Sequence, residues 1–155
     1  MPGDIGSKSD GRRGRADADQ DQIAALNRAL VLQNRSALQY SLTAGSLLGF
    51  EYAGITGELA SFAQAELEDA RHLVEKIVAL GGEPTEEVAP LSHLADPQEA
   101  VRWLIDSEGE ALEALQDAIA FTGRDATSEA VEHRVEHVIT RKQEQVDALI
   151  RASRT

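Results

Sequence analysis

The side chains best suited to chemistry in this sequence are a carboxylate and an imidazole three residues apart, Asp69 and His72. They open the amphipathic stretch DARHLVEKIVALGGEP, which ends at a double glycine and the residues that follow it. Residues three apart share a helix face, so both groups would point the same way. Together they could form half of a metal site, because carboxylate and imidazole suit iron, manganese or zinc. They could also be two polar residues that merely share a face.

Polar residues interrupt the apolar stripes of three further predicted helices in the same manner. Glu108, for example, lies four residues after Leu104 and four before Leu112, which places it on the inward stripe. The residues found near the middle of the four stripes are Gln33, Asp69, His72, Glu108, Lys142 and Gln145. Buried charges are costly unless they are paired or bind metal, so such a layer indicates a site.

Four amphipathic segments must position this layer. The predicted helices run from Asp21 to near GFEYAGITG, from about Gly57 to Leu80, from DPQE onward, and from TGRDATS onward. In DPQE, Asp96 caps the helix and Pro97 takes its first position. The first and third connections are short, whereas GGEPTEEVAPLSHLAD is long enough to travel the length of a bundle. The pattern predicts an all-α, antiparallel four-helix bundle with a long crossover between helices 2 and 3.

The first twenty residues differ from the rest in composition. Residues 1–20 carry four glycines, mixed charges and a single Ile, so they bury too little apolar surface to offset their ordering entropy. We expect a disordered N-terminal tail, either without a role or with an arginine-mediated contact to a partner. The bundle domain is then residues 21–152.

Charge and composition exclude several function classes. The net charge of −12 argues against a nucleic-acid partner, because phosphate contacts need a basic surface. The absence of cysteine excludes disulfides and thiolate metal sites and fits a reducing compartment. No apolar run approaches the ~20 residues needed to cross a bilayer, so we expect no membrane partner and a cytoplasmic location. Metal cations are more plausible partners than polyanions.

Three stretches carry a resemblance to a known family. LNRALVLQNRSALQY resembles the first helix of bacterioferritins, DARHLVEKIVALGGEP resembles their second, and EGEALEALQDAIAF resembles their third. The resemblance implies a ferritin-like fold over roughly residues 22–150 and a role in iron binding and storage. It also implies the family's di-iron centre, which uses one Glu on each of two helices and a Glu-x-x-His pair on each of the others.

Position by position, the resemblance identifies where the metal ligands would fall. They correspond here to Gln33, to Asp69 and His72, to Glu108, and to Lys142 and Gln145. Only His72 and Glu108 keep the family's residue type, so the centre is incomplete. One prediction is a single iron, manganese or zinc ion held by Asp69, His72 and Glu108, with water or Gln33 completing the shell. The alternative is that Lys142 bridges toward Glu108 or Asp69 and replaces the metals.

These alternatives give three hypotheses for function. The first is a bacterioferritin-related protein that binds and handles iron through an incomplete di-iron centre. The second, from a different class, is a non-catalytic helical scaffold or accessory subunit in which a Lys–carboxylate ion pair replaces the metals. The third is an oxidase with a mononuclear site. Enzymatic activity is left open, although an efficient ferroxidase is not expected.

The resemblance also bears on haem and on self-association. It places the family's axial methionine at Ala70, and Met1 is the sole methionine, so haem is not expected to bind. Members pair through their first two helices, so we expect a homodimer. Apolar residues at outer positions of the first helix support this expectation: Leu32, Leu38, Leu42 and Leu48. A second metal candidate, His133 and His137, has the spacing of a clamp but points away from the core stripe, which favours a solvated face.

Overall fold

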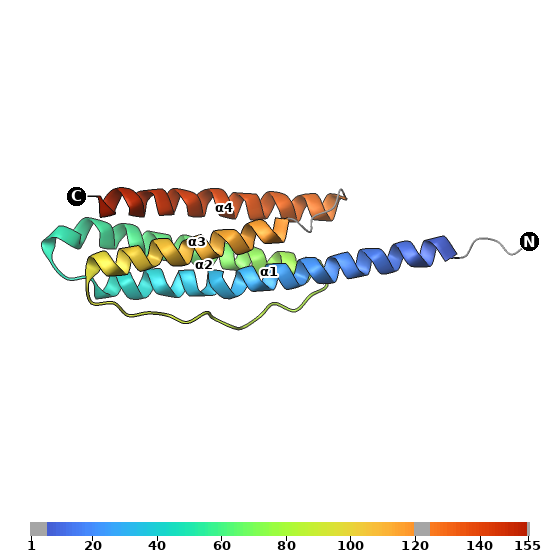
Figure 1. Cartoon of the computed structure of the whole chain (residues 1–155), viewed down its shortest axis with the longest axis horizontal. Helices are drawn as coiled ribbons and strands as arrows, with labels where there is room; N and C mark the ends of the chain where they lie inside the picture. Colours follow the sequence, from blue (N-terminus) through green and yellow to red (C-terminus); the bar gives the residue numbers. More distant parts are fainter. Residues whose placement is uncertain (1–5, 120–124, 155) are drawn as a thin grey trace, which may run out of the picture.

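The computed structural model describes residues 6–119 and 125–154, and of residues 6–16 it describes the backbone alone. Within these residues the helices are α1 (Gly6–Ser46), the short 3-10 helix η1 (Phe50–Tyr52), α2 (Ala53–Ala79), α3 (Pro97–Ile119) and α4 (Ala126–Ser153), and there is no strand. The extended segment between α2 and α3 runs along the bundle (Figure 1). The predicted all-α four-helix bundle with a long second connection is therefore confirmed.

Helix α1 is longer than the sequence pattern predicts. It begins at Gly6, so the backbone of residues 6–20 is helical where disorder was expected. Figure 1 shows that this part of α1 extends beyond the ends of the other helices. A physical reason is that extending an existing helix adds one hydrogen bond per residue without a new nucleus. Residues 1–5 lie outside the described residues, and the bundle boundary at residue 21 remains a prediction.

Two side-chain caps fix where α3 and α4 begin. The backbone N–H of Glu99 donates to Asp96 Oδ2 at 2.9 Å, and Pro97 is the first residue of α3, as predicted. At α4, the Ser128 N–H donates to Asp125 Oδ1 at 2.8 Å. Each cap satisfies a backbone donor that the first helical turn leaves free. Part of the predicted third connection, residues 120–124, lies outside the described residues.

The double glycine ends α2 as predicted. Gly81 adopts φ +85°, a conformation that side chains disfavour, and its N–H donates to Val78 O at 2.9 Å. The Gly82 N–H donates to Ile77 O at 2.9 Å, which completes a Schellman motif. A Cβ on Gly82 would lie 2.6 Å from Ile23 Cγ2. The second glycine therefore allows the chain to leave α2 in contact with α1.

Amide side chains on α1 hold the long crossover. Asn27 accepts from the Thr85 N–H at 2.8 Å and donates to Glu83 O at 3.0 Å. Further along, Gln39 accepts from the Ser92 N–H at 2.9 Å and donates to Ser92 O at 2.7 Å. These amides pair with backbone groups that have no helix or strand to satisfy them. The crossover is consequently fixed against α1 at both ends.

The apolar core forms two clusters along the bundle. One contains Leu26, Leu30, Leu73 and residues of α4 up to Val138, and the other contains residues such as Tyr40, Leu59, Leu104 and Leu149. Apart from His72, the predicted polar residues lie between the two clusters along each helix. Among the described residues, no helix is long and apolar enough to span a membrane.

Candidate functional site

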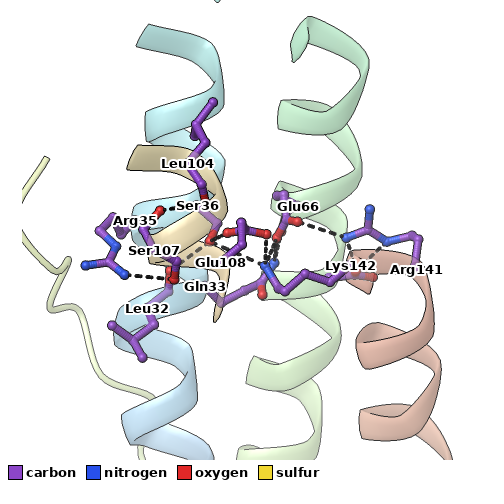
Figure 2. A network of polar contacts seen from close by, with 11 residues as sticks. Leu32, Gln33, Arg35, Ser36, Glu66, Leu104, Ser107, Glu108, Arg141 and Lys142 are labelled. Atoms are coloured by element: carbon purple, nitrogen blue, oxygen red, sulfur yellow. Dashed lines mark hydrogen bonds and ion pairs between the residues drawn. The ribbon is translucent and has the colours of Figure 1, made fainter. Parts of the chain in front are cut away.

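A buried layer of polar and charged side chains crosses the bundle, and every helix contributes to it (Figure 2). Its members are Gln33 and Ser36 from α1, Glu66 and Asp69 from α2, Glu108 from α3, and Arg141, Lys142 and Gln145 from α4. All are buried except Arg141, whose side chain is 22% exposed. With all groups ionised, three carboxylates face two cationic side chains.

Lys142 is the centre of the layer. Its ammonium group donates to Glu66 Oε2 at 2.7 Å, to Glu108 Oε2 at 2.9 Å and to Ser36 Oγ at 3.3 Å. These partners use all three ammonium hydrogens. Because the side chain is fully buried, the charge depends on these groups and not on water. The expected bridge from Lys142 to Glu108 is confirmed.

Glu66 receives more donors than any other carboxylate described above. Besides Lys142, the Gln33 amide donates to its Oε2 and to its backbone oxygen, the latter at 2.9 Å. With its amide oriented to suit its neighbours, Gln145 donates to Glu66 Oε1 at 2.6 Å. Arg141 lies 3.5 Å from the same oxygen. Side chains from α1 and α4 therefore converge on one carboxylate of α2.

Asp69 and Arg141 form a second ion pair at the edge of the layer. The guanidinium of Arg141 contacts Asp69 Oδ2 through both Nε, at 2.5 Å, and a terminal nitrogen. Asp69 was the alternative partner expected for Lys142, but the structure pairs it with the neighbouring arginine. Each of the three carboxylates in the layer thus has a cationic partner.

The titration of the layer follows from its burial. Burial raises the pKa of Glu66 to about 7. The cation of Lys142 offsets part of this rise, and the nearby Glu108 carboxylate adds to it. Burial lowers the pKa of Lys142, but the Glu66 and Glu108 carboxylates more than compensate, and its pKa is raised. Lys142 is therefore cationic at neutral pH. The layer carries one net negative charge when Glu66 is ionised and none when it is protonated.

A family model described as a ferritin-like domain matches residues 23–151. The chain belongs to the ferritin-like domain family. No curated protein matches it.

Solved structures of this ferritin-like family share the fold at low identity. A ferritin-like di-iron-carboxylate protein of Bacillus anthracis is 21% identical, with a TM-score of 0.80 over 86% of this chain and 96% of that one. The bacterioferritin of Desulfovibrio desulfuricans is 21% identical, with a TM-score of 0.80 over 90% and 81%. A dodecameric thioferritin from Bacteroides fragilis, described as bacterioferritin-related, is 20% identical, with a TM-score of 0.77 over 86% and 84%. At these identities the likeness establishes the fold.

The structure places the second-helix motif of this ferritin-like chain one turn earlier than the sequence comparison did. Glu66 and Asp69, three residues apart, both face the layer. His72 turns instead toward Glu68 on its own helix, with Nε2 3.1 Å from Glu68 Oε1. The inward pair is therefore Glu66 and Asp69, because one further turn carries His72 away from the bundle's centre.

Asp69, His72 and Glu108 are consequently not gathered into a metal-binding group. Asp69 is paired with Arg141 and Glu108 with Lys142. Over residues 6–119 and 125–154, no three His, Asp or Glu side chains lie together as a potential metal site. The donor set also does not fit the two metal ions of the family, because α4 supplies an ammonium and an amide where the family pattern has Glu and His.

Sequence reasoning missed Glu66, Arg141 and Ser36. A signal for Glu66 was present, because it lies seven residues after Leu59 and seven before Leu73, both fully buried. Arg141 gave no such signal, since it precedes the inward position of Lys142 and reaches the layer through its long side chain. Ser36, which donates to Glu108 Oε1, is a small residue that sequence patterns do not distinguish from a core alanine.

Two further polar residues support the layer. Arg35 donates to Ser107 O at 3.1 Å and lies over the Trp103 ring, 5.4 Å from its centroid, which ties α1 to α3 beside Glu108. Tyr40 is fully buried beside the layer. Burial and the nearby Glu108 and Glu66 carboxylates raise the pKa of Tyr40, so the phenol stays neutral.

The surface pair His133 and His137 is exposed, as expected.

Proposed function

We propose that this chain serves iron handling as a non-catalytic ferritin-like subunit, in which the ion pairs of Lys142 and Arg141 replace the metal ions. Iron handling is supported by its structural relatives, which include a di-iron-carboxylate protein and bacterioferritins. The absence of a competent oxidation centre rests on one observation, the ammonium of Lys142 between Glu66 and Glu108.

The position of that ammonium explains why a divalent ion would bind weakly. Lys142 satisfies both carboxylates, repels an incoming cation and fills part of the volume that the ion would need. Arg141 has the same effect on Asp69. A metal ion would have to displace two cations that are already paired.

The test compares the parent with a variant that restores the family's residue types on α1 and α4. Gln33→Glu, Lys142→Glu and Gln145→His together replace the ammonium and both amides by potential ligands. Both proteins are loaded with ferrous iron under argon, desalted and analysed for metal, and oxygen consumption is then followed after fresh ferrous iron is added. We expect substoichiometric iron and background oxygen uptake in the parent, and a clear gain in both in the variant.

If the parent instead retained two irons per chain, or consumed oxygen with ferrous iron as fast as the variant, the proposal would be wrong. A variant that folds but gains no metal would show that Lys142 is not what blocks the site. Circular dichroism of each protein establishes that the helices are intact before the metal analysis is interpreted.

The second candidate is the single ion at Asp69, His72 and Glu108. Its support is that His72 Nδ1 is buried without a hydrogen-bond partner among the described residues, so the imidazole has a free nitrogen. Binding would require Arg141 to release Asp69 and Lys142 to release Glu108. One firmly held metal ion per chain in the parent, lost in His72→Ala, would favour this candidate.

A further inference from the structure

One end of the bundle exposes an apolar surface that the charged layer does not explain. It is formed by the connection between α1 and α2, where Leu48 and Phe50 are among the most exposed large apolar side chains described. Phe50 is 101% exposed, so its ring is not covered by any described part of the chain. Gly49 adopts φ +107°, which turns the chain sharply between these two side chains. A fully exposed aromatic ring is a common anchor of protein contacts.

A cavity opens beside this connection. Its volume is about 520 Å³, within the range of ligand-sized pockets and larger than a phenyl ring requires. It is bounded by η1, the first turns of α2 and α3, and the last turn of α4. Apolar side chains from two helices line it, namely Ile55, Val101 and Ile105. The end of the bundle therefore carries both an apolar projection and an apolar cavity.

Two opposite charges border the same cavity without pairing. Glu51 follows Phe50 directly, and Arg102 lies on the first part of α3. Neither side chain makes an ion pair or a side-chain hydrogen bond with another residue in the described ranges 6–119 and 125–154. Each remains available to a group from outside the chain.

We propose that this end of the bundle docks against the same end of a second copy of the chain. Phe50 of each copy enters the cavity of the other, and Glu51 of each copy faces Arg102 of the other. A two-fold contact requires a surface that is complementary to itself. Here an apolar projection and a carboxylate adjoin an apolar cavity and a guanidinium, so one surface holds both halves of the match.

The charge pair selects a copy of this chain over other apolar partners. A carboxylate brought next to Arg102 compensates a charge that has no partner within the described part of the chain. The carboxylate that travels with Phe50 is Glu51 itself. This contact lies at the end of the bundle, whereas the homodimer expected from the sequence uses the side formed by α1 and α2. Both contacts can be present in one assembly, and each can be removed separately.

Sedimentation velocity of the full chain over a range of concentrations tests the contact. Phe50→Ser removes the projection, while Glu51→Arg and Arg102→Glu each place like charges together. We expect each variant to weaken one association step by about tenfold or more in Kd, which corresponds to about 1.4 kcal/mol. Val78→Ser is the matched control, because Val78 is an exposed apolar residue near the opposite end of α2. It should sediment like the parent.

The charge exchange provides the sharper test. The double variant Glu51→Arg with Arg102→Glu should recover the association of the parent, because the pair is restored with its signs reversed. An equimolar mixture of the two single variants should also associate. In a mixed pair, the arginine introduced at position 51 of one chain faces the glutamate introduced at position 102 of the other. The native Glu51 of the second chain likewise faces the native Arg102 of the first, so both contacts join unlike charges. Recovery in the mixture can arise only from contacts between chains.

Several results would overturn the proposal. Single variants that sediment like the parent, or a mixture that associates no better than its components, would show that Glu51 and Arg102 do not meet across an interface. Equal weakening by Val78→Ser would point to non-specific hydrophobic association. Circular dichroism and thermal unfolding of each variant would reveal any loss of association that arises from misfolding.

Discussion

Lys142→Ala probes the ion-pair layer most directly. The substitution leaves Glu66 Oε2 and Glu108 Oε2 without the donor that lies at 2.7 and 2.9 Å. Both carboxylates stay buried, so removing one partner of this network should cost about 3–5 kcal/mol of unfolding free energy at neutral pH. That is a large fraction of the ~5–15 kcal/mol typical of a folded domain.

Urea unfolding followed by circular dichroism measures this loss. Lys76→Ala is the control, because Lys76 is a half-buried lysine of α2 without an ion pair in the described part of the chain. Adding Glu66→Gln to Lys142→Ala should recover part of the loss, since one of the two unpaired charges is removed. Divalent metal should stabilise Lys142→Ala more than it stabilises the parent. A variant as stable as the parent without metal would refute the ion-pair interpretation.

Four further expectations follow from the structure. Burial raises the folded-state pKa of Glu66 to about 7, so the stability that its proton contributes is present below the unfolded pKa near 4.5 and is lost as pH rises through 7. Urea titrations should show the free energy of unfolding falling over this pH range in the parent and not in Glu66→Gln. Gln39→Ala removes both hydrogen bonds to Ser92, so hydrogen exchange at the Ser92 amide should accelerate, whereas exposed Gln64→Ala should leave it unchanged. Haem titration should produce no Soret band at one haem per dimer. Moving the second-helix motif one turn earlier shifts the expected axial position from Ala70 to Leu67, neither is methionine, and Met1 is the sole methionine. Light scattering should show that Leu38→Arg, at a half-exposed position of α1, weakens the expected side-by-side dimer. We do not expect a full cage, and a parent mass near twenty-four chains would contradict that expectation.

The sequence was sufficient for the fold because its signals act locally. Asp96 and Pro97 specify the start of α3, and Gly81 with Gly82 ends α2 by a motif that depends on backbone conformation alone. The length of the crossover then selects the topology. The sequence was misleading at residues 6–20, where composition indicated disorder and the backbone continues α1. Composition reports how much core a segment can build, but not whether an adjoining helix extends into it.

The candidate site was predictable at the level of the layer but not of its pairs. Periodicity identified Lys142 and Glu108 as inward, and the structure joins them. Residue type favoured Asp69 with His72 as the inward pair, because a carboxylate and an imidazole three residues apart resemble a metal-ligand pair more closely than Glu66 with Asp69 does. Residues 66, 69 and 72 advance around the helix by about 60° at each step, since one turn takes 3.6 residues. Only neighbouring helices decide which two of the three face inward.

The geometry of α4 explains how two consecutive basic residues can both pair with carboxylates of the layer. Consecutive side chains leave a helix about 100° apart, so Arg141 and Lys142 cannot share one direction. Lys142 points to the centre and reaches Glu66 and Glu108 (Figure 2). Arg141 instead pairs with Asp69 of α2. The two ion pairs meet at Glu66, which also lies 3.5 Å from Arg141. A single proton on Glu66 would then balance the charge of the layer, and burial favours that proton because it raises the pKa of Glu66 to about 7.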